Sequence, residues 1–213
     1  MAQPTVRLFD WAPSAFSIKV RSILDYKGVS FTRTSVFQPK RLLEVRRRGK
    51  IGKAPALEID GNLFVDSTDI AYELERRVPT PAIIPVQPRE RGLCHALEEW
   101  ADESLYFVGL YYQWEEPEGR KLVPQAFGSS LYGKILYRLF LRRVTGQIRG
   151  QGTSRKQPDH VRSDLRRHLV AIDALLQDNA FLLGERPYLC DFALLGQLVY
   201  LDRTPVGSQL LAE

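Results

Sequence analysis

Four prolines fall within the ten residues 79–88, at positions 79, 81, 85 and 88. Proline cannot continue a helix, and the residue before a proline favours an extended backbone. The sequence patterns also differ on the two sides of this segment, because strand-like and helix-like stretches alternate before it and only helix-like stretches follow it. We therefore predict a linker over 79–88 between two domains, residues 1–78 and 89–213.

Before the linker the patterns predict the order strand, helix, strand, helix, strand, strand, helix. Alternation of apolar and polar residues marks the strands, and Asp60-Gly61 between two short apolar runs is a strong hairpin signal. Ser67 is the expected N-cap of the last helix. The strands are expected over 5–11, 30–37, 54–59 and 62–65, and the helices over 16–27, 39–48 and 67–78. Strands that alternate with helices favour parallel pairing, so we expect the first three strands to be parallel in a thioredoxin-like domain.

After the linker, apolar residues recur at helical spacing. Helices are predicted over 89–114, 122–144, 158–177 and 191–201, with a break of the second near Gly128 or Gly133. The last of these helices is almost entirely apolar and is expected to be buried. A polar, glycine-rich connection is expected over 146–158. The fold class is therefore an α/β domain followed by an all-α domain.

Composition narrows the classes of protein further. Hydrophobic residues make up 44% of the 213 residues, enough for a sizeable core, yet no run is long and apolar enough to predict a membrane span. The two cysteines, Cys94 and Cys190, favour a reducing cytoplasm over a disulfide framework. The three histidines lack the spacing of metal ligands, and the basic runs lack interleaved aromatic residues, so neither a metal nor a nucleic-acid partner is expected.

Three segments together resemble the soluble glutathione S-transferase superfamily. They are residues 11–21, residues 52–57 with 66–70, and residues 181–187 leading into 190–193. The first is similar to the opening loop and helix of tau- and omega-type members, and a bacterial-type or metaxin-like relative also fits. The resemblance implies the glutathione S-transferase fold, glutathione as co-substrate and a homodimer.

Ser14 lies between the first strand and the first helix. A hydroxyl there can donate a hydrogen bond to a thiolate, which lowers the pKa of the thiol, and the helix N-terminus adds positive potential. The resemblance places the catalytic residue at Ser14 and puts Phe16 beside the bound glutathione. Ser17 is the alternative activator, and an ordinary N-cap is the alternative role for Ser14.

Ala54-Pro55 begins the third strand, a position where proline is tolerated. The resemblance implies that this proline is cis and that its neighbouring backbone clamps glutathione like an added strand. A trans-proline that only starts the strand is the alternative. Lys53 is the preferred partner for the glycyl carboxylate of glutathione, and Lys40 is the second candidate.

Asp66-Ser67 opens a helix directly after the hairpin. The free N–H groups of a helix N-terminus favour a carboxylate, and Asp66 can accept the ammonium of the γ-glutamyl group. A plain helix cap is the alternative reading of this pair. Relatives more often carry glutamate where this chain has Asp66, so its side chain has a shorter reach.

The second substrate, a small hydrophobic electrophile, is expected between the first loop and the aromatic residues of the first long helix. Its predicted pocket comprises Trp11, Ala12, Tyr106, Tyr111 and Tyr112. Aromatic residues at helical spacing also pack as core, so that reading stays open for each tyrosine.

The predicted function is conjugation of the glutathione thiolate to small hydrophobic electrophiles, as in detoxification. A non-catalytic interaction or scaffold protein of the same fold is the alternative. A thiol–disulfide oxidoreductase is a weaker third reading, because it requires cysteine at position 14. Two departures from the family pattern bear on this prediction: Tyr188 replaces the usual capping hydroxyl before Asp191, and the sequence stops soon after the predicted buried helix.

Overall fold

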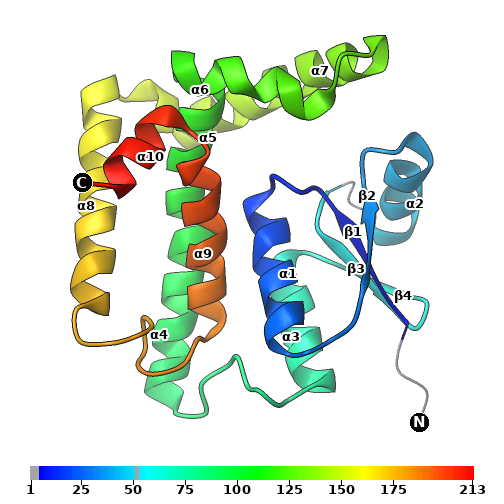
Figure 1. Cartoon of the computed structure of the whole chain (residues 1–213), viewed down its shortest axis with the longest axis vertical. Helices are drawn as coiled ribbons and strands as arrows, with labels where there is room; N and C mark the ends of the chain where they lie inside the picture. The colour runs from blue at the N-terminus through cyan, green and yellow to red at the C-terminus, as the bar shows by residue number, and fades with distance from the viewer. Residues whose placement is uncertain (1–4, 51–52) are drawn as a thin grey trace.

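The computed structural model describes residues 5–50 and 53–213. It has the predicted class, a four-stranded mixed sheet with helices on its two faces followed by a helical part (Figure 1). The first part contains β1 (Val6–Asp10), α1 (Ala15–Tyr26), β2 (Thr32–Ser35), α2 (Pro39–Gly49), β3 (Ala56–Ile59), β4 (Asn62–Val65) and α3 (Ser67–Arg77). The second part contains α4 (Pro88–Glu99), the π-helical turn η1 (Trp100–Leu105), α5 (Tyr106–Trp114), α6 (Pro117–Leu122), the 3₁₀ turn η2 (Val123–Phe127), α7 (Leu131–Gln151), the 3₁₀ turn η3 (Thr153–Arg155), α8 (Pro158–Leu176), α9 (Leu189–Asp202) and α10 (Pro205–Leu211).

The strand order is β2-β1-β3-β4. β1 and β2 are parallel, as expected, and β3 and β4 form the predicted antiparallel hairpin. The expectation that β3 is parallel to β1 is wrong, because the two strands pair antiparallel with Leu8 opposite Leu57. The reason is that an alternating pattern identifies the two faces of a strand and carries no information about its direction.

The two faces of the sheet bury different residues. Leu8, Leu57 and Ile59 pack with the apolar sides of α1 and α3 in the main hydrophobic core. Phe9 and Ala56 point to the opposite face, where a smaller cluster includes residues of α2. This alternation is the period of two that a strand imposes on its side chains.

The helical part packs on α1. Figure 1 shows α9 running beside α1. Gly196 of α9 lies against the backbone of the first turns of α1. A Cβ at Gly196 would lie 2.5 Å from the carbonyl oxygen of Ala15, so this contact requires glycine. The predicted buried helix is thus found, and most of its residues are buried. Asp191 at its start accepts hydrogen bonds from the backbone N–H groups of Leu182 and Tyr188, both at 2.8 Å.

The proline-rich segment contains neither helix nor strand from 78 to 87. Lys27, the C-cap of α1, binds the beginning of this segment, since its Nζ pairs with Glu75 at 2.6 Å and donates to the carbonyl oxygens of Val78 and Pro81. Ile83 is fully buried in the main core, which residues from both sides of the segment share. The division into two domains at this segment stays a prediction.

The helical part differs from expectation at α7 and α10. α7 continues to Gln151, so the glycine-rich connection predicted over 146–158 shortens to the residues that follow. Gly146 and Gly150 lie on the exposed side of α7, and burial of Val144 and Ile148 on its other side offsets their cost of about 1 kcal/mol each. The break at Gly128 is confirmed, whereas α10 was not predicted.

Stability is expected to fall in acid partly because of Glu73 in α3. Hydrogen bonds from Arg76 and then Arg77 lower the pKa of this carboxyl to about 2. A lowered pKa stabilises the fold above the ordinary value of about 4.3, and that contribution is lost as the pH falls toward 2. Acidification lowers the unfolding free energy of the native protein. Because Arg76 is largely exposed, Glu73→Gln should reduce this loss by only about 0.5–1 kcal/mol.

Urea unfolding at pH 7 and pH 3 measures this effect. Glu185 is exposed, and Glu185→Gln provides the control. This variant should lose the same unfolding free energy between pH 7 and pH 3 as the native protein. An identical pH dependence in the native protein and the Glu73→Gln variant would contradict the assignment.

Candidate functional site

The strand register brings three separated segments to one edge of the sheet. Phe9 near the end of β1 lies opposite Ala56 at the start of β3, and Ala56 lies opposite Val65 at the end of β4. The chain segments that adjoin these three positions outside the strands therefore lie at the same edge of the sheet. They are the loop after β1, Pro55 before β3 and Asp66 after β4.

Ser14 is buried and forms the N-cap of α1, with its Oγ accepting a hydrogen bond from the N–H of Ser17 at 3.3 Å. This bond uses an oxygen lone pair and leaves the hydroxyl proton able to donate elsewhere. Ser17, the alternative activator, is fully buried, and its Oγ accepts from the N–H of Trp11 at 3.3 Å. Ser17 thus fixes the loop that carries Ser14.

The peptide bond between Ala54 and Pro55 is cis, as the resemblance implied. Pro55 is buried, and Lys53 beside it is exposed. Lys40 is also exposed and lies in the first turn of α2. Phe16 lies in the first turn of α1, where its ring contacts the ring of Tyr106 at a centroid distance of 4.7 Å.

Asp66 caps α3, and Ser67 is the first residue of that helix. The expectation that Ser67 is the N-cap is therefore wrong by one residue. Asp66 has a positive φ of 78°, and its Oδ1 accepts a hydrogen bond from the N–H of Thr68 at 2.9 Å. Aspartate satisfies this N–H as well as serine does, so the sequence alone does not distinguish the two caps.

A buried polar cluster lies behind the start of α3. Lys19 of α1 is fully buried and pairs with Glu98 of α4 and, at 2.6 Å, with Asp102 of η1. Thr68 and Gln197 complete this Lys19 cluster through hydrogen bonds to the charged groups. Burial raises the pKa of the Asp102 carboxyl. The cluster thus ties the first turn of α3 to the helical part.

The Lys19 cluster was not predicted from the sequence, although the sequence carries a signal for it. Lys19 lies on the apolar face of α1, three residues after Phe16 and four before Ile23. Gln197 interrupts the apolar run of α9 in the same way. A cation and an amide on faces that must be buried predict buried partners, since an unpaired buried charge is costly.

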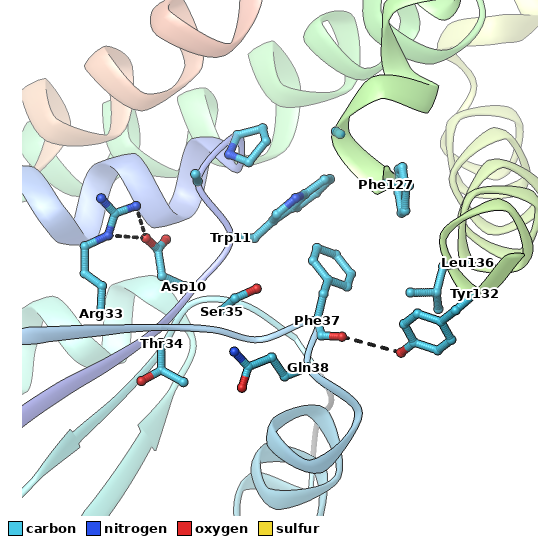
Figure 2. A pocket seen from close by; sticks show the side chains of 13 residues that line it. Asp10, Trp11, Arg33, Thr34, Ser35, Phe37, Gln38, Phe127, Tyr132 and Leu136 are labelled. Atoms are coloured by element: carbon cyan, nitrogen blue, oxygen red, sulfur yellow. Dashed lines mark hydrogen bonds and ion pairs between the residues drawn. The ribbon is translucent and has the colours of Figure 1, made fainter. Parts of the chain in front are cut away.

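A cavity of about 720 Å³ opens next to the loop that carries Ser14. Figure 2 shows it between the end of β1, the connection from β2 to α2, and the segment that contains η2 and the start of α7. The residues that line it are Asp10, Trp11, Ala12, Pro13, Arg33, Thr34, Ser35, Phe37, Gln38, Ala126, Phe127, Tyr132 and Leu136.

The cavity has one charged and one aromatic end. At the charged end Arg33 pairs with Asp10 at 2.5 Å. At the aromatic end the ring of Phe37 lies 5.1 Å from that of Trp11 and 5.9 Å from that of Phe127, measured between centroids. Such a wall favours a flat apolar molecule.

Of the residues predicted for the electrophile pocket, Trp11 and Ala12 line this cavity and the three tyrosines do not. Tyr112 belongs to the main core with 3% of its surface exposed, so its assignment to a pocket is wrong. Tyr111 packs against the same core, and Tyr106 packs against a second core cluster, where burial raises its pKa to about 12.

The aromatic residues that line the cavity in place of the three tyrosines were not predicted from the sequence. Phe37 follows the edge strand β2, while Phe127 and Tyr132 flank the break at Gly128. An aromatic residue next to a helix break is a weak signal, because its direction depends on how the chain turns there. Within residues 5–50 and 53–213, no cluster of three or more His, Cys, Asp or Glu side chains could hold a metal ion.

Residues 8–82 match the family described as "Glutathione S-transferase, N-terminal domain". The whole chain superposes on a glutathione S-transferase from Rhodospirillum rubrum with a TM-score of 0.67 and 19% identity, covering 98% of this chain and 86% of that one. The chain therefore contains a glutathione S-transferase N-terminal domain and has the glutathione S-transferase fold.

The chain is similar to enzymes whose names describe different substrates. It is 26% identical to maleylacetoacetate isomerase of Pseudomonas aeruginosa, over 95% of this chain and 84% of the isomerase. It is 21% identical to isoprene-epoxide–glutathione S-transferase of a Rhodococcus species, over 90% of this chain and 82% of that protein. The β-etherase LigF of a Sphingobium species shares its fold, with a TM-score of 0.68 at 18% identity over 98% of this chain and 93% of LigF.

Proposed function

We propose that this chain binds glutathione at the edge of the sheet where Ser14, Pro55 and Asp66 converge, and transfers its thiolate to small apolar electrophiles. The observation that carries the proposal is the register of β1, β3 and β4, which brings these segments together. The named activities of the relatives include a glutathione S-transferase, which supports glutathione as the shared co-substrate.

Each group of glutathione has a partner in this arrangement. The hydroxyl of Ser14 donates to the thiolate, and the backbone beside Pro55 pairs with the backbone of the tripeptide. Asp66 accepts the ammonium of the γ-glutamyl group while the N-terminus of α3 at Ser67 faces its carboxylate. Lys53, with Lys40 as second candidate, neutralises the glycyl carboxylate.

The second substrate lies in the aromatic cavity, which adjoins the loop before Ser14. The thiolate attacks an electrophilic carbon of that molecule, forming a carbon–sulfur bond while the leaving group departs with the electrons of the broken bond. The thiol proton passes to solvent before the attack.

Calorimetric titration with glutathione, followed by a conjugation assay with a chlorodinitrobenzene-type substrate, tests the proposal. The sharpest variant is Asp66→Asn, because asparagine also caps a helix and removes only the charge. Binding by the native chain and weaker binding by this variant are expected. No heat of binding at millimolar glutathione would overturn the proposal, and binding without conjugation would favour a non-catalytic scaffold protein.

The aromatic wall gives a separate prediction for the second substrate. Tyr132→Ala should lower kcat/KM for an aromatic electrophile about fivefold while leaving glutathione affinity unchanged, because one aromatic contact contributes about 1 kcal/mol. Leu131→Ala on the exposed side of α7 is the matched control. Equal kinetics in both variants would show that the electrophile binds elsewhere.

We also propose a cytoplasmic homodimer with a role in detoxification, in which the first half of one chain packs against the second half of its partner. The support for it is the family resemblance. Sedimentation velocity at micromolar concentration distinguishes the dimer from a monomer.

A further inference from the structure

Helix α7 carries an unusual concentration of positive charge. Its residues include no aspartate or glutamate, and its basic residues are Lys134, Arg138, Arg142, Arg143 and Arg149, all of which are exposed. The groove between α6 and α7 adds Arg120, so that Arg120, Arg138 and Arg142 line it with one carboxylate, Glu115. This end of the molecule is therefore strongly basic, whereas the whole chain has a formal charge of only +5.

The same helix exposes an aliphatic stripe beside these cations. Leu131, Ile135 and Leu139 have 75%, 49% and 61% of their surfaces exposed. They follow one another at intervals of four residues, so they lie on one side of the helix. The stripe is not the buried side of α7, because Val144 and Ile148 face the core from the other side.

The place of α7 in the fold leaves this side open. Figure 1 shows α7 lying across one end of the molecule, over the end of α1 and beside α6. An amphipathic helix with aliphatic residues next to lysines and arginines has the features of a helix that lies in the plane of a membrane interface. No helix within the described residues is both long and apolar enough to cross a membrane.

We propose that the exposed face of α7 docks on an anionic bilayer surface. Leu131, Ile135 and Leu139 enter the boundary between headgroups and acyl chains, and Arg138 and Arg142 contact lipid phosphates. A second copy of this chain fits less well, because it would oppose one basic face to another. A nucleic acid would leave the aliphatic stripe without a partner.

This proposal concerns the surface alone and is independent of glutathione chemistry. Flotation of the purified protein with phosphatidylcholine vesicles, with and without phosphatidylglycerol, tests it. Binding is expected only with phosphatidylglycerol and should weaken as salt screens the charges. Arg138→Gln/Arg142→Gln should reduce the vesicle partition coefficient roughly 30-fold, at about fivefold for each charge.

Two matched controls separate the α7 face from general charge and apolarity. Arg166→Gln/Arg167→Gln removes the same charge from α8 and should leave binding nearly unchanged. Leu139→Ser should reduce binding about tenfold, whereas Val170→Ser, at an equally exposed position of α8, should not. Absence of binding to phosphatidylglycerol vesicles at low salt would overturn the proposal. Equal losses in the α7 and α8 variants, or a dimer that the α7 variants dissociate, would overturn it as well.

Discussion

Replacing Lys19 by methionine is expected to destabilise the folded state by about 3–5 kcal/mol, the largest effect of any single change considered for this chain. The substitution leaves Glu98 and Asp102 buried without their cation. One oxygen of Glu98 already lacks a hydrogen-bond partner among the described residues, so the cluster has no spare donor to compensate. Urea unfolding followed by circular dichroism measures the loss.

Lys121→Met is the matched control, because Lys121 is exposed and forms a surface ion pair with Glu118 at 2.5 Å. Its effect should stay within about 0.5 kcal/mol. Adding Glu98→Gln to Lys19→Met should recover part of the lost stability, since it removes one unpaired charge. Equal stability of the Lys19 and Lys121 variants would show that the buried cluster does not hold the two parts of the chain together.

Replacing Ser14 by alanine is expected to reduce kcat/KM for conjugation at pH 7 by about 10- to 100-fold. Loss of a hydrogen bond to the thiolate raises the thiol pKa by one to two units, and each unit lowers the thiolate fraction about tenfold when the pH lies below that pKa. The two rates should converge at a pH above the pKa of free glutathione, because solvent then ionises the thiol without help. Steady-state rates across pH measure both effects.

The same substitution removes the N-cap of α1, which costs about 1 kcal/mol of stability. Thr204→Ala removes the equivalent cap of α10 and provides the control for that loss. If the rate of the Ser14 variant stays low at high pH, or if Thr204→Ala lowers the rate equally, the serine acts through structure rather than on sulfur.

The sequence predicted the parts of the fold that depend on local periodicity and turn chemistry. The hairpin at Asp60-Gly61 and the buried helix α9 were located within a few residues, because a two-residue turn and an apolar helix leave clear patterns. The direction of β3 was not predictable in this way, since the same alternation buries Leu57 and Ile59 in either direction.

The sequence placed Ser14 after β1, Pro55 before β3 and Asp66 after β4. Their meeting at one edge was not predictable, because it requires β3 to run antiparallel to β1. The wall of the cavity was not predictable either, because it depends on how α5 and α7 turn in the fold. Tyr112 faces the core and Phe127 faces the cavity, yet both belong to aromatic-rich helical sequence.

The pKa of the thiol of bound glutathione shows whether the hydroxyl of Ser14 acts on the sulfur. Titration of the thiolate by its ultraviolet absorbance, in the complex and free in solution, gives the thiol pKa in each state. In the native protein we expect the pKa to lie at least one unit below that of free glutathione, and in Ser14→Ala we expect it to return toward the free value. A bound pKa equal to that of free glutathione in the native protein would show that Ser14 does not stabilise the thiolate.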